Sequence, residues 1–117
     1  MKTLNQYELI FKALSDKSRL RILKMLQRKS LCVCEITEIL NLATSTVSKH
    51  LSILRDAGLI TDEKDKKWIN YQINQSPKDN IVSNALLFVQ LQLEDDELIA
   101  NDKKAIGCID RNVLCCK

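Results

Sequence analysis

Apolar residues recur at helical spacing near the start of the chain, three or four positions apart on one side of a helix. The positions that follow this spacing are Leu4, Tyr7, Ile10, Phe11 and Leu14. The polar pair Ser15-Asp16 interrupts the pattern and supplies a residue that can cap the next helix. The pattern therefore predicts a first helix that ends before residue 16.

A second helix is predicted to follow and to end near Ser30. Its apolar face consists of Leu20, Ile22, Leu23 and Leu26. Charged side chains lie between these positions, and we expect them on the outer surface of the helix. They are Lys17, Arg19, Arg21, Lys24, Arg28 and Lys29.

Two further helices are predicted between residues 34 and 58, separated by a polar turn at residues 41–44. A short one, between Cys34 and Asn41, has its apolar residues at Ile36, Ile39 and Leu40. The longer one has its inward positions at Val47, Leu51 and Leu54. We expect Thr44 or Ser45 to cap its start and Gly58 to end it.

The apolar period changes from helical spacing to alternation after Gly58. Apolar and polar residues alternate in 59–61 and 68–73, on either side of the charged segment 63–67, which predicts a β-hairpin.

Beyond Pro77 the helical period returns and predicts one more helix, which closes before or within the acidic run 94–97.

Composition supports a single, mainly helical domain. A chain of 117 residues with 45% hydrophobic content can bury one core. Only two Gly, one Pro and 4% aromatic residues argue against a β-sandwich and against flexible linkers. The fold class expected is mainly α with a small β-hairpin.

The charge pattern favours a cytoplasmic protein with a polyanionic partner. Lys2, Glu8 and Lys12 interrupt any apolar run at the start of the chain, so we expect no signal peptide and no membrane span. Residues 1–60 carry ten Lys and Arg against five Asp and Glu, whereas residues 61–117 carry eight against ten. This basic first half is compatible with binding to nucleic acid.

The order of the predicted elements is that of a winged helix-turn-helix. In this arrangement the second helix of the pair enters the major groove, and the hairpin wing lies along the DNA backbone or minor groove. The candidate DNA-binding residues on the recognition helix are Ser45, Thr46, Ser48, Lys49 and His50. Those on the wing are Lys64, Lys66 and Lys67.

Five cysteines, an odd number, indicate metal ligands or redox-active thiols in a reducing compartment. Cys32 and Cys34 precede the recognition helix, and thiolates at this spacing favour soft ions. On a regular helix the two side chains would point to nearly opposite sides, whereas in extended backbone they share one face. We therefore expect metal capture to favour an unwound start to the third helix.

A second group of cysteines closes the chain, at Cys108, Cys115 and Cys116. On one continuous helix Cys108 and Cys115 would be about 10 Å apart, so shared ligation requires the tail to fold back. Two interpretations remain open, a second metal site and incidental thiols in a disordered terminus.

The segments LCVCE, STVSKHLSILRDAGLI and KKWINYQI resemble the ArsR/SmtB family of bacterial metal-responsive repressors. The resemblance covers roughly residues 8–95. It implies a winged helix-turn-helix homodimer, paired through its first and last helices, that leaves its operator when metal binds. We accordingly expect residues 1–95 to form the DNA-binding and dimerisation domain, and residues 96–117 to form a cysteine-containing tail.

The resemblance also implies a metal site at Cys32 and Cys34, with one departure. The arsenic-sensing version of the family motif has a third cysteine where this chain has Thr37. Either two thiolates suffice, or a tail cysteine supplies the third, within one protomer or across the dimer. The family wing often has Gly where this chain has Lys66, so Asp65 is expected to take the strained position of the turn.

The sequence thus predicts a repressor, not an enzyme, that releases operator DNA on binding As(III) or Sb(III), with Cd(II) and Pb(II) as alternative inducers. A thiol-based redox or sulfide sensor of the same fold is the first alternative. A small thiol enzyme or metallochaperone is a distant one, because the chain has no Cys-x-x-Cys and no His near a cysteine.

Overall fold

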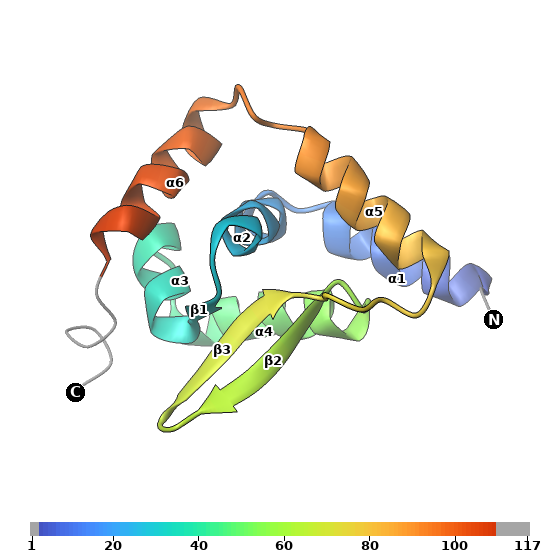
Figure 1. The fold of residues 1–117 in the computed structure, drawn as a ribbon, viewed down its shortest axis with the longest axis horizontal. Helices are drawn as coiled ribbons and strands as arrows, with labels where there is room; N and C mark the ends of the chain where they lie inside the picture. Colours follow the sequence, from blue (N-terminus) through green and yellow to red (C-terminus); the bar gives the residue numbers. More distant parts are fainter. Residues whose placement is uncertain (1–2, 110–117) are drawn as a thin grey trace.

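The computed structural model describes residues 3–109, which form six helices and a small three-stranded sheet (Figure 1). The helices are α1 (Leu4–Leu14), α2 (Lys17–Arg28), α3 (Val33–Leu40), α4 (Thr44–Asp56), α5 (Asn80–Leu91) and α6 (Glu97–Cys108). The strands are β1 (Leu31–Cys32), β2 (Ile60–Asp65) and β3 (Trp68–Ile73). Within these residues no helix is both long and apolar enough to cross a membrane.

The core is built around α2, which lies at the centre of the molecule (Figure 1). Helices α1, α4, α5 and α6 and strand β3 all pack against it. Ile22 and Leu23 of α2 are fully buried, as are Leu51 and Leu54 of α4. The inward positions predicted for these two helices are confirmed except for Leu20, which is half-buried and packs against the core. One continuous apolar cluster joins α4 to the centre of the fold.

The local chemistry of the chain explains where most of the predicted helices begin and end. Asp16 caps α2 by accepting a hydrogen bond from the N–H of Arg19 at 3.1 Å. Asn41, in the left-handed region at φ 56°, ends α3, a position that Asn tolerates well. Gly58, at φ 83°, follows the end of α4, where most L-residues would be strained.

The start of α4 differs from the expectation that Thr44 or Ser45 caps it. The N-cap residue is Ala43, which has extended backbone and offers no side-chain acceptor. Helical backbone already begins at Thr44, so the hydroxyl groups of Thr44 and Ser45 lie within the first turn and are exposed. The first N–H groups of α4 thus lack a side-chain cap.

The sheet has the strand order β1-β3-β2 and is antiparallel throughout. The hairpin β2–β3 was predicted, but its pairing continues to Asp65 opposite Trp68 and leaves only Lys66 and Lys67 to turn. For this reason Lys66, not Asp65, takes the strained conformation, at φ 58°. Strand β1 was not predicted; its Cys32 pairs with Asn70 of β3.

Two charged residues of α2 are buried, contrary to the expectation that they lie on its outer surface. Arg19 is 8% exposed and Lys24 is 4% exposed. The Lys24 ammonium donates to the main-chain carbonyls of Val89 and Gln90, at 3.3 and 3.1 Å, where α5 ends. Arg19 donates in the same way at the end of α1. Burial is possible because main-chain oxygens accept from both cations, and Lys24 also pairs with the Glu94 carboxylate at 3.5 Å.

Helix α6 lies within the segment that the sequence predicted as a tail. It packs across α2 and α3 (Figure 1). Its residues Ile99 and Ile106 are buried. Asp102 of α6 receives two hydrogen bonds from the Arg21 guanidinium, both at 2.9 Å. Residues 97–108 are therefore part of the packed structure, while Cys115 and Cys116 lie outside the described residues.

Candidate nucleic-acid interface and cysteine pair

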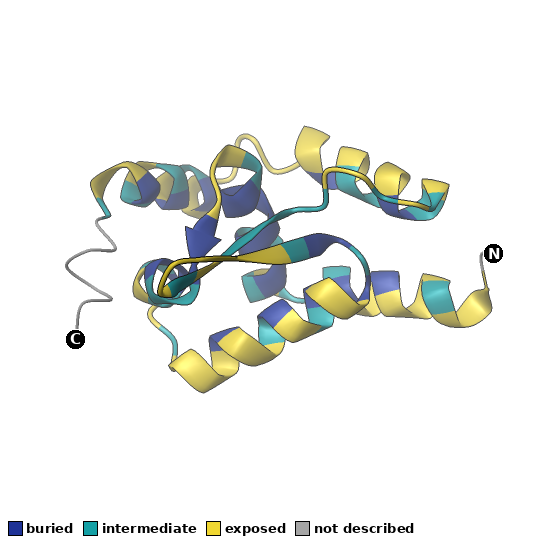
Figure 2. Cartoon of the chain, turned by 60° about the horizontal axis from the view of Figure 1, so that its bottom comes forward, coloured by how far each residue is buried: buried dark blue, intermediate teal, exposed yellow. Residues whose placement is uncertain are grey.

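Helix α4 presents a continuous polar face to solvent. Figure 2 shows its outer side exposed, in contrast to the buried side that meets the core. Four of the predicted DNA-binding residues are exposed on it: Ser45, Thr46, Ser48 and Lys49. Hydroxyl groups and a lysine at the N-terminal end of such a helix can reach base edges and phosphates in a major groove.

His50, the fifth residue predicted on this helix, is only partly exposed and faces α2. Its Nδ1 lies 3.1 Å from Nη1 of Arg19 and 4.0 Å from Oδ2 of Asp16. Burial raises the pKa of the Asp16 carboxyl, but the N–H and the charge of Arg19 outweigh this and hold that pKa below its usual value. The imidazole thus belongs to a polar cluster between α2 and α4.

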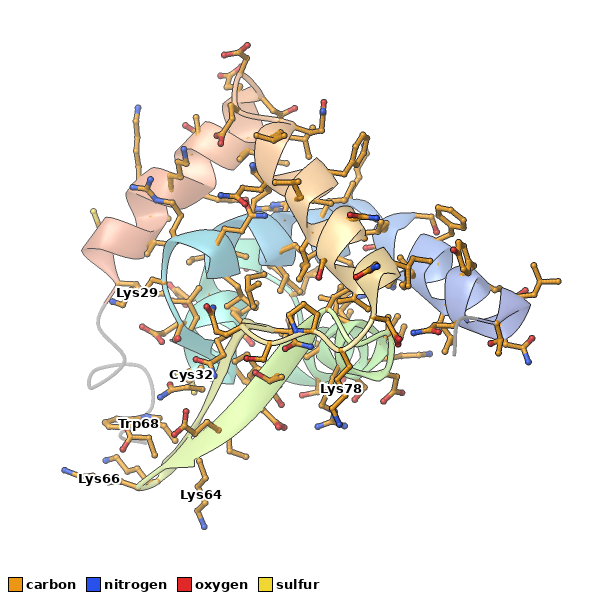
Figure 3. The ribbon with its side chains drawn as sticks, turned by 45° about the vertical axis from the view of Figure 1, so that its right-hand side comes forward. Lys29, Cys32, Lys64, Lys66, Trp68 and Lys78 are labelled. Carbon is orange, nitrogen blue, oxygen red and sulfur yellow. The ribbon has the colours of Figure 1, made fainter. Side chains whose placement is uncertain are left out.

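The three predicted wing lysines lie at the far end of the hairpin. Figure 3 shows Lys64 and Lys66 pointing away from the body of the molecule, and both side chains are exposed. Lys67 lies over the ring of Trp68, 4.9 Å from its centre, which favours a cation–π interaction. A hairpin of this length and charge can follow a DNA backbone beside the recognition helix.

An ion pair that the sequence analysis missed joins the recognition helix to the wing. Nη1 of Arg55, in the last turn of α4, lies 2.9 Å from Oδ2 of Asp62 in β2. Both side chains are substantially exposed, so the pair contributes little to stability. It connects the last turn of α4 to the first strand of the wing. Arg55 is seven positions after Ser48, a spacing that places both on one helix face.

Cys32 and Cys34 lie on either side of the junction between β1 and α3. Cys32 is the N-cap residue of α3, with extended backbone at φ −92° and ψ 169°, and its side chain is buried. Cys34 is in the first helical turn and is half-buried. The extended backbone that the spacing argument requires is thus present at Cys32, although α3 is already helical at Cys34.

Glu35 closes a capping box around Cys32. Its Oε1 accepts a hydrogen bond from the Cys32 N–H at 2.9 Å, and the carboxylate is buried. Burial raises the pKa of the Cys32 thiol above its usual value, and the negative charge of Glu35 raises it further. A hydrogen bond from the Glu35 N–H acts in the opposite direction and does not outweigh them. Cys32 therefore prefers the protonated state when no metal is bound.

The cysteines predicted as further ligands are not brought together with this pair in the described part of the chain. Cys108 is exposed at the end of α6. Residues 3–109 contain no group of three or more His, Cys, Asp or Glu side chains close enough to hold a metal ion. The two described sulfurs at the start of α3 are of the kind that a soft ion requires. Cys32 is a free thiol, whereas Cys34 is disulfide-bonded and becomes a ligand only after reduction.

Comparison with known proteins assigns the family. Residues 16–62, from the N-cap of α2 into β2, match the model for bacterial regulatory proteins of the arsR family. The chain is 43% identical over 84 residues to the arsenical resistance operon repressor of Bacillus subtilis (strain 168), an alignment that covers 71% of this chain and 80% of that protein. The chain belongs to the arsR family.

Solved structures agree with this assignment. The homodimeric winged helix-turn-helix DNA-binding domain Mb0332 of Mycobacterium bovis superposes with a TM-score of 0.63 at 26% identity, over 75% of this chain and 78% of that one. Reduced HlyU from Vibrio cholerae gives 0.61 at 28% identity, over 77% and 92%. The predicted winged helix-turn-helix is confirmed, and this arsR-family chain is a DNA-binding regulator of transcription, not an enzyme.

Proposed function

We propose that the protein is a homodimeric repressor that binds operator DNA through α4 and the wing and releases it when a soft metalloid binds its cysteine thiolates. The Bacillus subtilis relative is named an arsenical resistance operon repressor. This name supports As(III), or the chemically similar Sb(III), as the inducer. Cd(II) and Pb(II) are alternatives that the same sulfur donors accept.

The position of the cysteine pair carries this proposal. Cys32 and Cys34 stand at the start of α3, and α3 packs directly against the recognition helix α4. Because Cys32 is extended and Cys34 is helical, bringing both sulfurs to one ion requires the first turn of α3 to open. Opening that turn breaks the capping box between Cys32 and Glu35 and moves α3 against α4.

The ligand set is proposed to be completed by the end of the chain. A trivalent arsenic ion prefers three thiolates, and Thr37 stands where the family motif places a third cysteine. Cys108, Cys115 and Cys116 are the remaining candidates, and α6 lies against α3, the helix that begins at the cysteine pair. Because ligation requires thiolates, binding of the ion releases protons.

Dimerisation is proposed to use the exposed apolar faces of α1 and α5. Phe11 and Tyr7 line a groove along α1, and Leu87, Phe88 and Leu91 are exposed on α5, which contacts α1. Exposed apolar residues that cluster in this way mark an interaction surface. The solved Mycobacterium bovis neighbour is described as homodimeric, which supports a second copy of this chain as the partner.

Arsenite-dependent release of DNA tests the metalloid proposal. The probe is a DNA duplex that the purified protein selects from a random pool, and affinity is measured with and without arsenite. We expect the variant Cys32→Ser plus Cys34→Ser to bind the duplex normally and to ignore arsenite. Serine is a good N-cap, so the variant should retain the start of α3.

The matched control is Cys108→Ser, which removes one exposed thiol and leaves the α3 pair in place. If the double variant still releases the duplex fully on adding arsenite, the α3 pair is not the sensor. Loss of the response only in the Cys108→Ser variant would move the sensing site to the chain end. Failure of the wild-type protein to select any duplex would overturn the repressor proposal itself.

A redox sensor is the second candidate, favoured by one observation. Cys34 is disulfide-bonded in the structure, and one solved neighbour is described as reduced HlyU. If oxidation is the signal, peroxide releases the duplex without metal, and Cys34→Ser abolishes that release. Release by arsenite from the fully reduced protein, with no effect of peroxide, would exclude this candidate.

A further inference from the structure

Arg19 occupies an unusual position for a charged residue of a DNA-binding protein, because its guanidinium is buried behind the recognition helix. Nε donates to the carbonyl oxygen of Ala13 at 2.9 Å, and Nη2 donates to that of Lys12 at 3.0 Å. These carbonyls belong to the last turn of α1, where the helical ladder no longer supplies every oxygen with a donor. The Lys12 carbonyl also accepts from the N–H and the hydroxyl of Ser15. Arg19 therefore caps the end of α1 from within α2.

The remaining guanidinium nitrogen reaches the recognition helix. Nη1 of Arg19 lies 3.1 Å from Nδ1 of His50. A guanidinium has only donors and stays protonated in proteins, so Nδ1 accepts the hydrogen bond and carries no proton. The ring proton is consequently on Nε2. This contact selects one of the two neutral tautomers of the imidazole.

The selected tautomer matters because of where His50 lies. It follows the exposed Lys49 on α4, and its own side chain is 16% exposed. With Nδ1 held by Arg19, Nε2–H is the ring group that remains to donate a hydrogen bond to DNA. A phosphate oxygen is the acceptor that suits such a donor at the edge of a recognition helix.

We propose that Arg19 is a positioning residue for DNA binding, which holds His50 as the Nε2–H tautomer so that this imidazole donates to a backbone phosphate. The same guanidinium joins the last turn of α1 to α4, so it also sets the recognition helix relative to α1. This inference rests on the DNA-binding function proposed above. It assigns roles to Arg19 and His50 that the exposed face of α4 and the wing lysines do not explain.

The tautomer can be measured in the free protein, independently of DNA. Because His50 is the single histidine of the chain, nitrogen-15 NMR of the imidazole is unambiguous. We expect the wild-type protein to show Nε2 protonated and Nδ1 unprotonated at pH 7.5, and Arg19→Lys to weaken this preference. An Nδ1–H tautomer in the wild-type protein would overturn the proposal even if the protein binds DNA normally.

A matched pair of His50 variants tests the phosphate contact. His50→Asn places an acceptor near the position of Nδ1 but has no donor at that of Nε2, whereas the longer His50→Gln can place its amide N–H group near Nε2. Against the selected duplex, we expect about tenfold weaker binding by His50→Asn and a smaller loss by His50→Gln, the size of one hydrogen bond to a charged group.

Thermal unfolding and the NMR response to DNA separate this contact from a merely structural role. We expect His50→Asn to unfold near the wild-type temperature, and the wild-type Nε2 resonance to move when the duplex is added. Wild-type affinity in His50→Asn, or an Nε2 signal that the duplex leaves unchanged, would contradict the phosphate contact. If no duplex is bound by any form, the DNA-binding function fails while the tautomer result still stands.

Discussion

At the scale of single residues, the environment of Cys32 should control how readily its sulfur acts as the proposed metal ligand. The thiolate is the ligand, and both burial and the charge of Glu35 raise the pKa of this thiol. Below the raised pKa the thiol is mostly protonated, so the rate of metal capture by Cys32 should increase as the pH rises toward that pKa. The buried carboxylate should thus slow metal loading of the proposed site at neutral pH.

Glu35→Gln should therefore load arsenite faster than the wild-type protein near pH 7. Glutamine can keep the capping box, because its amide oxygen still accepts from the Cys32 N–H, but the negative charge is gone and the pKa of the thiol falls. We expect a several-fold faster rate by stopped-flow absorbance of the fully reduced protein, since each pKa unit changes the thiolate fraction up to tenfold.

The advantage of Glu35→Gln should disappear at high pH, where both proteins carry the thiolate. Glu38→Gln is the matched control, because Glu38 is exposed on the same helix and should leave the rate unchanged. A rate ratio that does not vary with pH would show that the charge of Glu35 does not act through Cys32.

Lys66 combines a strained backbone with a predicted contact to DNA. Its φ of 58° lies in the left-handed region, which disfavours a side chain with a Cβ atom. Lys66→Gly should therefore stabilise the free protein by up to about 1 kcal/mol in denaturant unfolding. The same substitution should weaken DNA binding and lower the salt dependence of affinity by about one charge per protomer.

Lys64→Ala separates the two effects, because Lys64 is exposed in the extended strand β2 and carries no backbone strain. It should weaken DNA binding without any gain in stability. If Lys66→Gly binds DNA as tightly as the wild-type protein, the lysine at the turn makes no phosphate contact.

At the scale of elements, α6 is held to the domain by one buried ion pair and a few apolar side chains. Asp102 is nearly buried and binds the Arg21 guanidinium through both oxygens, at 2.9 Å each. Such paired contacts are geometrically specific, and removing one partner leaves the other charge unsatisfied. The attachment of α6 to α2 therefore depends strongly on Asp102.

Asp102→Asn should destabilise the protein by about 2–4 kcal/mol and loosen α6. Hydrogen exchange should become faster in residues 97–108 and stay slow in α4, whose buried residues belong to the central core. Asp95→Asn, an exposed change in the connection before α6, is the control. Unchanged exchange in α6 of the Asp102→Asn variant would show that Ile99 and Ile106 suffice to hold this helix.

The same elements show which parts of the fold could be predicted from the sequence. Helix α4 and the hairpin were predictable because their apolar residues follow a clear period over many positions. Strand β1 was not, because two residues carry no period and its partner β3 lies about forty positions away. Helix α6 was missed because the acidic run 94–97 was interpreted as the end of the last helix, and residues 96–117 as a cysteine-containing tail.

Buried charges were the other feature beyond prediction. Arg19 and Lys24 have the helical spacing of surface residues. Their burial depends on main-chain carbonyls of α1 and α5 and, for Lys24, on an ion pair with Glu94. A sequence does not indicate which carbonyl a side chain will meet. Four of the predicted DNA-binding residues, by contrast, are exposed on one face of α4 as their spacing indicated, and their contacts with DNA stay a prediction.

At the scale of the whole molecule, the proposed dimer should depend on the apolar residues of α1 and α5. A two-fold symmetric interface uses the same surface on both copies, so one substitution occurs twice in it. Phe88 is exposed on α5 beside Leu87 and Leu91. Phe88→Glu would place two like charges in an apolar interface, where neither has a partner.

We expect the wild-type protein to sediment as a dimer and Phe88→Glu as a monomer at micromolar concentration, with the dimer dissociation constant raised at least about 100-fold. The monomer should still fold, because Phe88 is exposed and the core lies on the opposite side of α5. Its affinity for the selected duplex should fall steeply, and the salt dependence should drop to about half, because only one protomer then contacts the phosphates.

Ile69→Glu is the control for this experiment. Ile69 is also an exposed apolar residue, but it lies on β3 of the wing, away from α1 and α5. Its variant should remain a dimer, because the added charge stays in solvent. If both variants remain dimers, the subunits meet through another surface, and the coupling of α1 to the recognition helix through Arg19 then acts within one protomer, without a link to assembly.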